Sequence, residues 1–167
     1  MDIDVPEVIA AEGNLEGIEF ITSGEQFLAF ILGKEHYAID ILSVKEIRGW
    51  EHPTMIPHSQ TYMKGVINIR GMIVPIVDLR LRFSVGEVIY DASTVVIVLT
   101  HEVEKVPRTI GFVVDAVSDV LNAEESDIKK SPSFGNAIPL HYIRGLVNVD
   151  KNVVTLLNIE YLMTLEE

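Results

Sequence analysis

The residues that most often carry out chemistry in proteins are present in this chain, but their spacing fits no catalytic or metal-binding motif. The histidines are scattered through predicted loops without the His-x-x-x-His or Cys/His spacing of a zinc site. No Gly-x-Ser-x-Gly elbow, phosphate-binding loop or dinucleotide fingerprint occurs. The histidines are His36, His52, His58, His101 and His141. The sequence therefore predicts no metal site, no cofactor and no catalytic residue.

Acidic side chains are the remaining candidates for catalysis. The pairs Glu124-Glu125 and Asp115/Asp119 lie where a turn or a surface element would keep them solvated. Catalytic carboxylates need burial or close pairing, which a sequence does not display. A hydrolase is therefore kept as an alternative that requires a buried carboxylate pair. Asp40, Asp78 and Asp115 as surface caps would dismiss it.

The elements around these residues follow an internal repeat. Residues 62–79 and 142–159 align at an offset of 80 with matching hydrophobic phase. In this alignment Tyr62, Gly65, Asn68, Val74 and Leu79 meet Tyr142, Gly145, Asn148, Val154 and Ile159. A fixed offset over many positions indicates one supersecondary unit used twice.

The hydrophobic period is that of short strands. Residues 27–32 and 37–41 predict a hairpin, and residues 65–69 and 72–77 predict a second hairpin closed by Arg70-Gly71, with Gly71 available for positive φ. Residues 44–47 lie between the two hairpins and continue the alternation of side chains that is typical of a strand.

The second half repeats this order. Residues 95–99 correspond to the first strand of the first half, and residues 111–120 match residues 38–47 at an offset of 73. Residues 101–108 are expected to form a longer and more charged turn than their counterpart. Asp78 and Asn158 each follow a strand and are expected to cap a short helix.

These elements predict a mainly β protein with short helices, made of two SH3-like five-stranded β-barrels packed side by side. Closure into barrels removes the unpaired edges of short sheets. The expected organisation is a barrel over about residues 25–90 and another over about 91–163, with exchange of terminal segments between the barrels left open. Residues 164–167 form a C-terminal tail.

Composition narrows the class of partner. A net charge of −12 argues against nucleic acid, because binding to a duplex requires Lys and Arg on its phosphates. Residues 1–24 carry six acids and no Lys or Arg, so we expect a mobile acidic leader, with a short docking helix as the alternative. The longest apolar run, residues 95–99, is far too short to insert into a membrane. The absence of Cys fits a reducing compartment, so the cytoplasm is the expected location.

One segment has a distinctive resemblance. Residues 68–79 read Asn-Ile-Arg-Gly-Met-Ile-Val-Pro-Ile-Val-Asp-Leu. This closely resembles the Asn-h-Arg-Gly-x-h-h-Pro-h-h-Asp-Leu signature of the CheW family, where h is an aliphatic residue. The resemblance extends over residues 26–163, with supporting segments at 26–30, 37–41, 44–49 and 111–120.

The resemblance implies a fold of two SH3-like barrels and a non-catalytic role. CheW-like proteins couple the cytoplasmic tips of methyl-accepting chemoreceptors to the regulatory domain of the histidine kinase CheA. The expected partners are therefore this kinase domain and the receptor tips, with other copies of the adaptor in rings as a further expectation. We expect a cytoplasmic monomer in dilute solution that is recruited to membrane-associated receptor arrays. An adaptor of a different chemosensory pathway, such as one governing surface motility, would share every motif.

The resemblance also implies a receptor-binding groove between the barrels. Its residues in this sequence would be Ile41, Val44, Glu46, Gly65, Ile73, Val95, Gly111 and Val120. The ordinary alternative is burial in a barrel core for the aliphatic residues and close backbone approach for the two glycines.

Arg70 is singled out because its guanidinium could bridge carbonyls or carboxylates at the seam between the barrels, where Lys would not substitute. The alternative is an exposed cation in a turn. The residues facing the kinase are not identified, and the charged 101–108 segment beside them has no assigned role.

Overall fold

The computed structural model describes residues 24–130 and 138–164 and contains ten strands with short helices between them. The predicted acidic leader and C-terminal tail lie almost wholly outside the described residues. The strands are β1 (Glu25–Leu32), β2 (Glu35–Asp40), β3 (Val44–Gly49), β4 (Met63–Ile69), β5 (Met72–Asp78), β6 (Val95–Val103), β7 (Val106–Val114), β8 (Ala116–Ala123), β9 (Ile143–Val149) and β10 (Asn152–Leu157). The helices are η1 (Ile41–Ser43), α2 (Leu79–Phe83), η2 (Glu125–Asp127), η3 (Leu140–Tyr142) and α3 (Ile159–Leu162).

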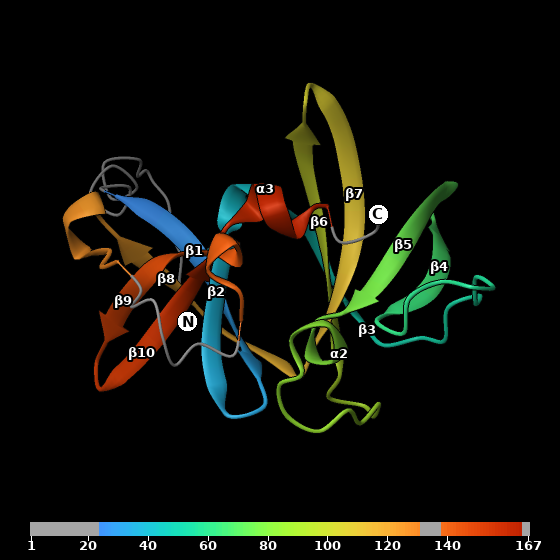
Figure 1. Ribbon diagram of the computed structural model, residues 1–167, viewed down its shortest axis with the longest axis horizontal. Helices are drawn as coiled ribbons and strands as arrows, with labels where there is room; N and C mark the ends of the chain where they lie inside the picture. Colours follow the sequence, from blue (N-terminus) through green and yellow to red (C-terminus); the bar gives the residue numbers. More distant parts are fainter. Residues whose placement is uncertain (1–23, 131–137, 165–167) are drawn as a thin grey trace, which may run out of the picture.

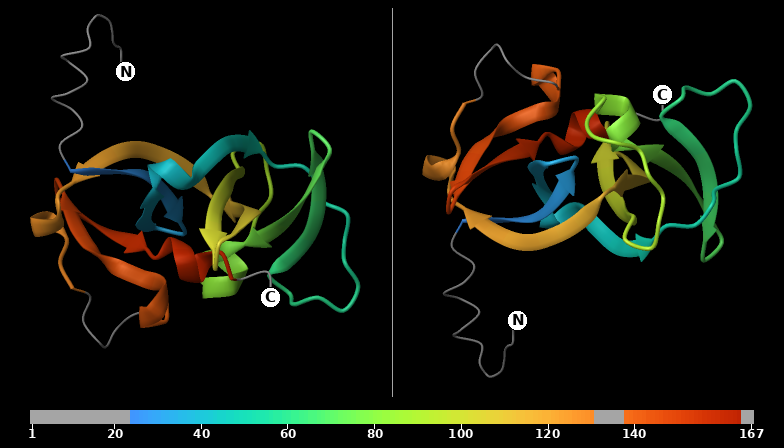
Figure 2. Two further views of the ribbon diagram at one scale, coloured as in Figure 1. Left: turned by 90° about the horizontal axis from the view of Figure 1, so that it is seen from above. Right: turned by 90° about the horizontal axis from the view of Figure 1, so that it is seen from below.

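The strands form two five-stranded sheets that lie side by side (Figure 1). The first sheet has the order β8-β1-β2-β10-β9 and the second has the order β3-β6-β7-β5-β4. Figure 2 shows each sheet curved around its own interior, with α2 and α3 near the junction. The predicted mainly β fold of two small five-stranded units is confirmed.

The two sheets do not correspond to residues 25–90 and 91–163. The hairpin β1–β2 belongs to the sheet of β8–β10, and the hairpin β6–β7 belongs to the sheet of β3–β5. The exchange left open in the sequence analysis thus involves the first hairpin of each half. Its physical reason is clearest between β7 and β8, which Asp115 alone connects. The commonest tight turns contain two residues, so the chain runs on into the other sheet.

The register shows that the repeat is structural. Ile76 of β5 pairs with Gly111 of β7, and the counterparts Leu156 and Ala38 pair in the other sheet. Both ladders are parallel. The bulge between Val44 and Glu46 also has its counterpart, where Val117 and Asp119 of β8 face β1. The offsets of 80 and 73 therefore hold at the level of single residue pairs.

The apolar core has one shared part and two separate parts. The largest cluster takes residues from both sheets, including Phe30 and Tyr37 from the first and Leu99 and Phe112 from the second. A smaller cluster lies inside each sheet. Burial of apolar surface at the shared cluster is the main force that holds the two sheets together.

The expected long turn at residues 101–108 is wrong. β6 and β7 continue through this segment as paired strands, and Glu104 and Lys105 form the turn with φ of 53° and 66°. A two-residue turn with both φ values positive matches the twist of a hairpin. The charged residues thus lie along an extended hairpin.

Both predicted helix caps are confirmed. Asp78 Oδ1 accepts a hydrogen bond from Arg80 N at 2.9 Å at the start of α2, and Asn158 Oδ1 accepts one from Glu160 N at 3.0 Å at the start of α3. In the described part of the chain, no helix has the length and apolar character needed to cross a membrane.

Candidate partner-binding surface

The Arg70-Gly71 turn joins β4 to β5 and explains three residues of the signature. Arg70 and Gly71 have φ of 51° and 87°, so both lie in the left-handed region. Asn68 Oδ1 accepts a hydrogen bond from Gly71 N at 2.8 Å, which closes the turn. The expected positive φ at Gly71 is confirmed.

The Arg70 side chain extends from the turn between β4 and β5 to β3, at the other edge of the second sheet. Its Nη2 lies 2.5 Å from Glu46 Oε1, although 68% of the Arg70 side chain is exposed. Arg48 Nη1 lies 3.5 Å from the other carboxylate oxygen of Glu46. An exposed ion pair contributes only about 0.2–1 kcal/mol to folding stability. This pairing therefore mainly positions the Arg70 and Glu46 side chains. The structure thus brings together a predicted groove residue and the predicted turn residue.

Three predicted groove residues face inward. Ile41 of η1, Val44 of β3 and Val95 of β6 are partly buried and pack against the shared apolar cluster. Their positions fit the ordinary reading of core residues at the seam between the sheets. They shape the surface above them and present little area of their own.

The two predicted glycines are buried where chains approach closely. A Cβ on Gly65 would lie 2.1 Å from the carbonyl oxygen of Thr54, and φ at Gly65 is 136°. A Cβ on Gly111 would lie 2.7 Å from Ile76 Cδ1. The Gly65 contact is with backbone and its φ is positive, so this position requires glycine. The Gly111 contact is with the end of a side chain, which would have to shift to admit a Cβ.

Ile73 and Val120 are the two predicted aliphatic groove residues with large exposed fractions, 61% and 48%. Ile73 lies on β5 of the second sheet and Val120 on β8 of the first sheet. The predicted groove residues thus come from both sheets. Ile73, Val120 and the Glu46 carboxylate remain available at the surface.

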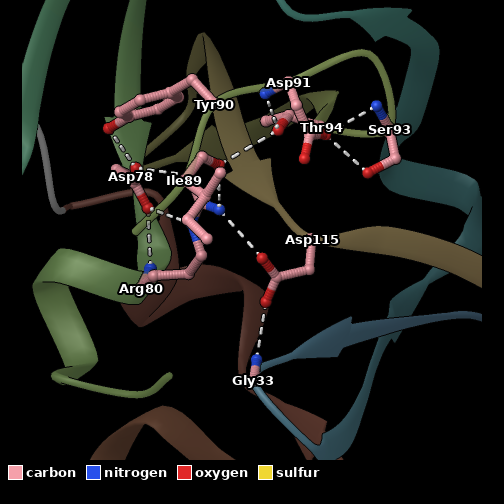
Figure 3. A network of polar contacts seen from close by, with 9 residues as sticks. All are labelled: Gly33, Asp78, Arg80, Ile89, Tyr90, Asp91, Ser93, Thr94 and Asp115. Atoms are coloured by element: carbon pink, nitrogen blue, oxygen red, sulfur yellow. Dashed lines mark hydrogen bonds and ion pairs between the residues drawn. The ribbon is translucent and has the colours of Figure 1, made fainter. Parts of the chain in front are cut away.

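A buried network around Arg80 was not predicted (Figure 3). Arg80 is 1% exposed. Its Nε and Nη2 donate to the two carboxylate oxygens of Asp78 at 3.1 and 3.0 Å, and Nη1 donates to Asp115 Oδ1 at 2.9 Å. Asp115 Oδ2 accepts from Gly33 N of the first sheet's hairpin turn at 2.6 Å. Arg80 thus links both sheets through one guanidinium.

Electrostatics keep this network charged. Burial alone would lower the pKa of Arg80, but its hydrogen bonds and charge attraction to Asp78 and Asp115 raise that pKa above its ordinary value. Burial, followed by its hydrogen bond to Asp78, raises the pKa of Tyr90, so its hydroxyl stays a neutral donor. The sequence signal that could have revealed Arg80 is its place directly after Leu79 on a short helix that follows a buried strand.

A second arginine of α2 also lies at the junction. The Arg82 guanidinium lies over the rings of Tyr62 and Tyr142 at 5.5 and 5.3 Å. These tyrosines occupy equivalent positions in the two copies of the repeat. Arg82 Nη2 donates to the Tyr142 hydroxyl at 3.1 Å. The helix α2 therefore contributes two arginines to the contact between the halves.

The carboxylates named for the hydrolase alternative have structural uses. Asp40 Oδ1 accepts from Leu42 N at 3.0 Å as an exposed cap. Asp78 also caps a helix but is fully buried, so it is not the surface cap that would dismiss the hydrolase alternative. Asp78 and Asp115 are both bound by Arg80, so they balance one buried charge. Among residues 24–130 and 138–164, no cluster of His and acidic residues could hold a metal ion.

Comparison with known proteins gives concordant matches. A family model described as a CheW-like domain matches residues 26–167. Chemotaxis protein CheW of Klebsiella aerogenes is 44% identical over 146 residues, covering 87% of this chain and 86% of that protein. The probable chemotaxis protein CheW of Rhizobium etli is 36% identical over 139 residues, covering 83% of this chain and 87% of that protein.

A solved structure matches as well. The scaffolding protein TtCheW of Thermoanaerobacter tengcongensis superimposes with a TM-score of 0.75 at 27% identity. The match covers 84% of this chain and 92% of that protein. The likeness therefore extends over both sheets.

Proposed function

The chain belongs to the CheW family of chemotaxis adaptors, and from this premise we propose that it couples the cytoplasmic tips of chemoreceptors to the regulatory domain of the histidine kinase CheA. It does so as a non-catalytic scaffold in the cytoplasm, recruited to membrane-associated receptor arrays. The observation that carries the proposal is the surface formed by the Arg70-Gly71 turn and Glu46, where Asn68 closes the turn and the exposed Arg70 pairs with Glu46.

The receptor helix is proposed to dock over the seam between the two sheets. Ile73 and Val120 offer exposed aliphatic contacts from different sheets, and Glu46 offers a carboxylate held in place by Arg70. An amphipathic helix would lay its apolar side against the aliphatic residues. Ile41, Val44 and Val95 support this surface from below, while Gly65 and Gly111 permit the close strand packing that shapes it.

The two-sheet architecture supports a connector with more than one partner. Each sheet repeats the other residue pair by residue pair, so the molecule presents two related but chemically different ends. A kinase domain and further copies of the adaptor could occupy these ends to build rings. Such interfaces are commonly modest in area and gain strength by repetition. An adaptor of another chemosensory pathway would use the same surfaces with different receptors.

The test is a titration of the purified protein with a receptor-tip fragment and with the CheA regulatory domain, separately and together. Ile73→Asp should weaken receptor binding at least tenfold, because it places a charge in an apolar contact. Val153→Asp is the matched control, because Val153 is the repeat counterpart of Ile73 and is 52% exposed. Equal loss in both variants, or binding of neither partner to the unaltered protein, would refute the proposal.

A further inference from the structure

Each curved sheet has a pocket at one open end, which we call its mouth. The two mouths are equivalent in position but differ in the chemistry of their side chains. A small pocket of about 150 Å³ lies at the mouth of the second sheet, and one of about 820 Å³ lies at the mouth of the first. The residues lining the small pocket are Lys45, Glu46, Ile69, Arg70, Met72, Val74, Val98 and Thr109. Their repeat counterparts, in the same order, are Ser118, Asp119, Val149, Asp150, Asn152, Val154, Ala29 and His36, and all of these line the large pocket. Ala29 corresponds to Val98 because Asp119 pairs with Ala29 as Glu46 pairs with Val98. The two mouths can therefore be compared position by position.

An ion pair spans the mouth of the second sheet, but the residues at the corresponding positions of the first sheet cannot form one. Glu46 and Arg70 pair across the second sheet's mouth at 2.5 Å. Asp119 and Asp150 stand at the corresponding positions of the first sheet. Two carboxylates repel each other, so the residues at these two positions cannot form the ion pair that spans the other mouth.

Side-chain size widens the difference. Val98 corresponds to Ala29, Met72 to Asn152 and Lys45 to Ser118, and each replacement is shorter. These shorter side chains and the missing ion pair accompany the larger volume of the first mouth, although His36 there is larger than its counterpart Thr109. Its floor and walls combine apolar residues such as Val147 with polar residues such as Asn148.

The charge at this mouth favours a cation. Asp127 adds a third carboxylate to Asp119 and Asp150. Lys129 also lines the pocket, but its ammonium donates to the backbone carbonyl of Ser126 at 3.4 Å. In the part of the chain that the structure describes, no ion pair joins Asp119 or Asp150 to a basic side chain. A planar guanidinium with several donors suits separated carboxylates better than an ammonium does.

We propose that the mouth of the first sheet binds an arginine side chain presented by a turn of a partner protein. The partner's guanidinium would take the place that Arg70 occupies in the sister mouth, between the carboxylates of Asp119 and Asp150. The chain's own residues 1–24 are unsuitable occupants, because they contain six acids and no Lys or Arg. This site shares Val120 with the proposed receptor surface, and the arginine peptide tests it separately from receptor binding.

The probe is a blocked peptide, Asn-Ile-Arg-Gly-Met, copied from residues 68–72. Its control replaces Arg by citrulline, which keeps the shape and removes the charge. The arginine peptide should cause saturable changes in the NMR amide shifts of Asp119, Val120, Asn148 and Asp150, and added salt should weaken them. The citrulline peptide should bind at least tenfold more weakly.

A charge replacement locates the site. Asp150→Arg should form the missing ion pair with Asp119 and reduce peptide binding at least tenfold. The turn tolerates this residue, because φ is 56° at Asp150 and 51° at Arg70 in the sister turn. Glu102→Arg, on the distant β6–β7 hairpin, makes the same change of net charge and should leave binding unchanged. Asp150→Asn, which keeps the size of the side chain, gives a second variant and should weaken binding severalfold.

Three results would overturn the inference. Equal binding of the arginine and citrulline peptides would show that the guanidinium is not recognised. Unchanged binding in both Asp150 variants would place the peptide elsewhere. Concentration-dependent shifts of the same amides in the protein alone would make a second copy the occupant in place of a partner protein.

Discussion

Arg70 is an exposed side chain that we expect to matter more for coupling than for folding. Its pair with Glu46 spans two strands of the second sheet, yet most of the guanidinium faces water. We predict that Arg70→Ala changes the free energy of unfolding by no more than about 1 kcal/mol. The same variant should lose most of its coupling of receptor to kinase, because Glu46 is no longer held in register.

Thermal melting and a kinase-coupling assay measure these two effects side by side. Lys105→Ala is the matched control, because Lys105 is also an exposed cation with positive φ in a two-residue turn. If Arg70→Ala loses stability and coupling to the same degree, its functional role is wrong.

Arg80 is the opposite case, a charge whose place in the fold is entirely internal. We predict that Arg80→Met destabilises the protein by about 3–5 kcal/mol, because it leaves Asp78 buried without its cation. Urea unfolding would measure this loss. Asp78→Asn combined with Arg80→Met should be less destabilising than Arg80→Met alone. A double variant as unstable as the sum of its single variants would contradict the charge-balance argument.

Glu25 gives a pH-dependent prediction. The hydrogen bonds from Arg144 hold the pKa of Glu25 below its ordinary value of 4.5. A lowered folded-state pKa stabilises the protein above the unfolded-state pKa, and this contribution is lost as pH falls through the folded-state pKa. Glu25→Gln should therefore cost no more than about 1 kcal/mol at pH 7, since the pair is partly exposed.

The difference in unfolding free energy between Glu25→Gln and the unaltered protein should shrink below pH 4.5. Denaturant titrations across this range would measure it. A difference that stays constant or grows towards low pH would show that Arg144 does not stabilise the ionised carboxylate.

At the residue scale, sequence reasoning succeeded where local geometry decides the outcome. Gly71 and the caps Asp78 and Asn158 follow from backbone requirements that short motifs express. Arg80 could not be recognised, because its burial depends on Asp115, a residue distant in the sequence. Local patterns do not show which surface a charged side chain will meet.

At the scale of elements, the exchange of hairpins is the main feature that the periodicity did not reveal. Each hairpin and each repeat strand was visible as a local pattern. Which hairpin joins which sheet depends on connections as short as Asp115 and on the shared core. The turn predicted for residues 101–108 is wrong for a related reason, because charged exposed strands resemble a loop in sequence.

The exchange predicts the behaviour of the separated halves. Each half contributes one hairpin to the other's sheet, so neither residues 1–90 nor residues 91–167 can complete a five-stranded sheet alone. We expect each fragment alone to lack dispersed amide NMR signals and the mixture to recover the spectrum of the intact chain. A half that folds without its partner would contradict the exchanged topology.

At the scale of the whole molecule, the two sheets are similar in frame and different in surface. The repeat supplies equivalent ladders and bulges, while single replacements such as Arg70 against Asp150 give each end its own chemistry. The shared core and the Arg80 network join the ends into one body. In the proposed function, such a body would hold two different partners at a defined separation.

The most direct test of this account is a reconstituted assay of CheA autophosphorylation with receptor-tip fragments, in the presence and absence of the protein. Receptors should alter kinase activity only when the protein is present, and Ile73→Asp should abolish this dependence. Kinase activity that is indifferent to the protein, with cognate receptors and kinase in the assay, would contradict it.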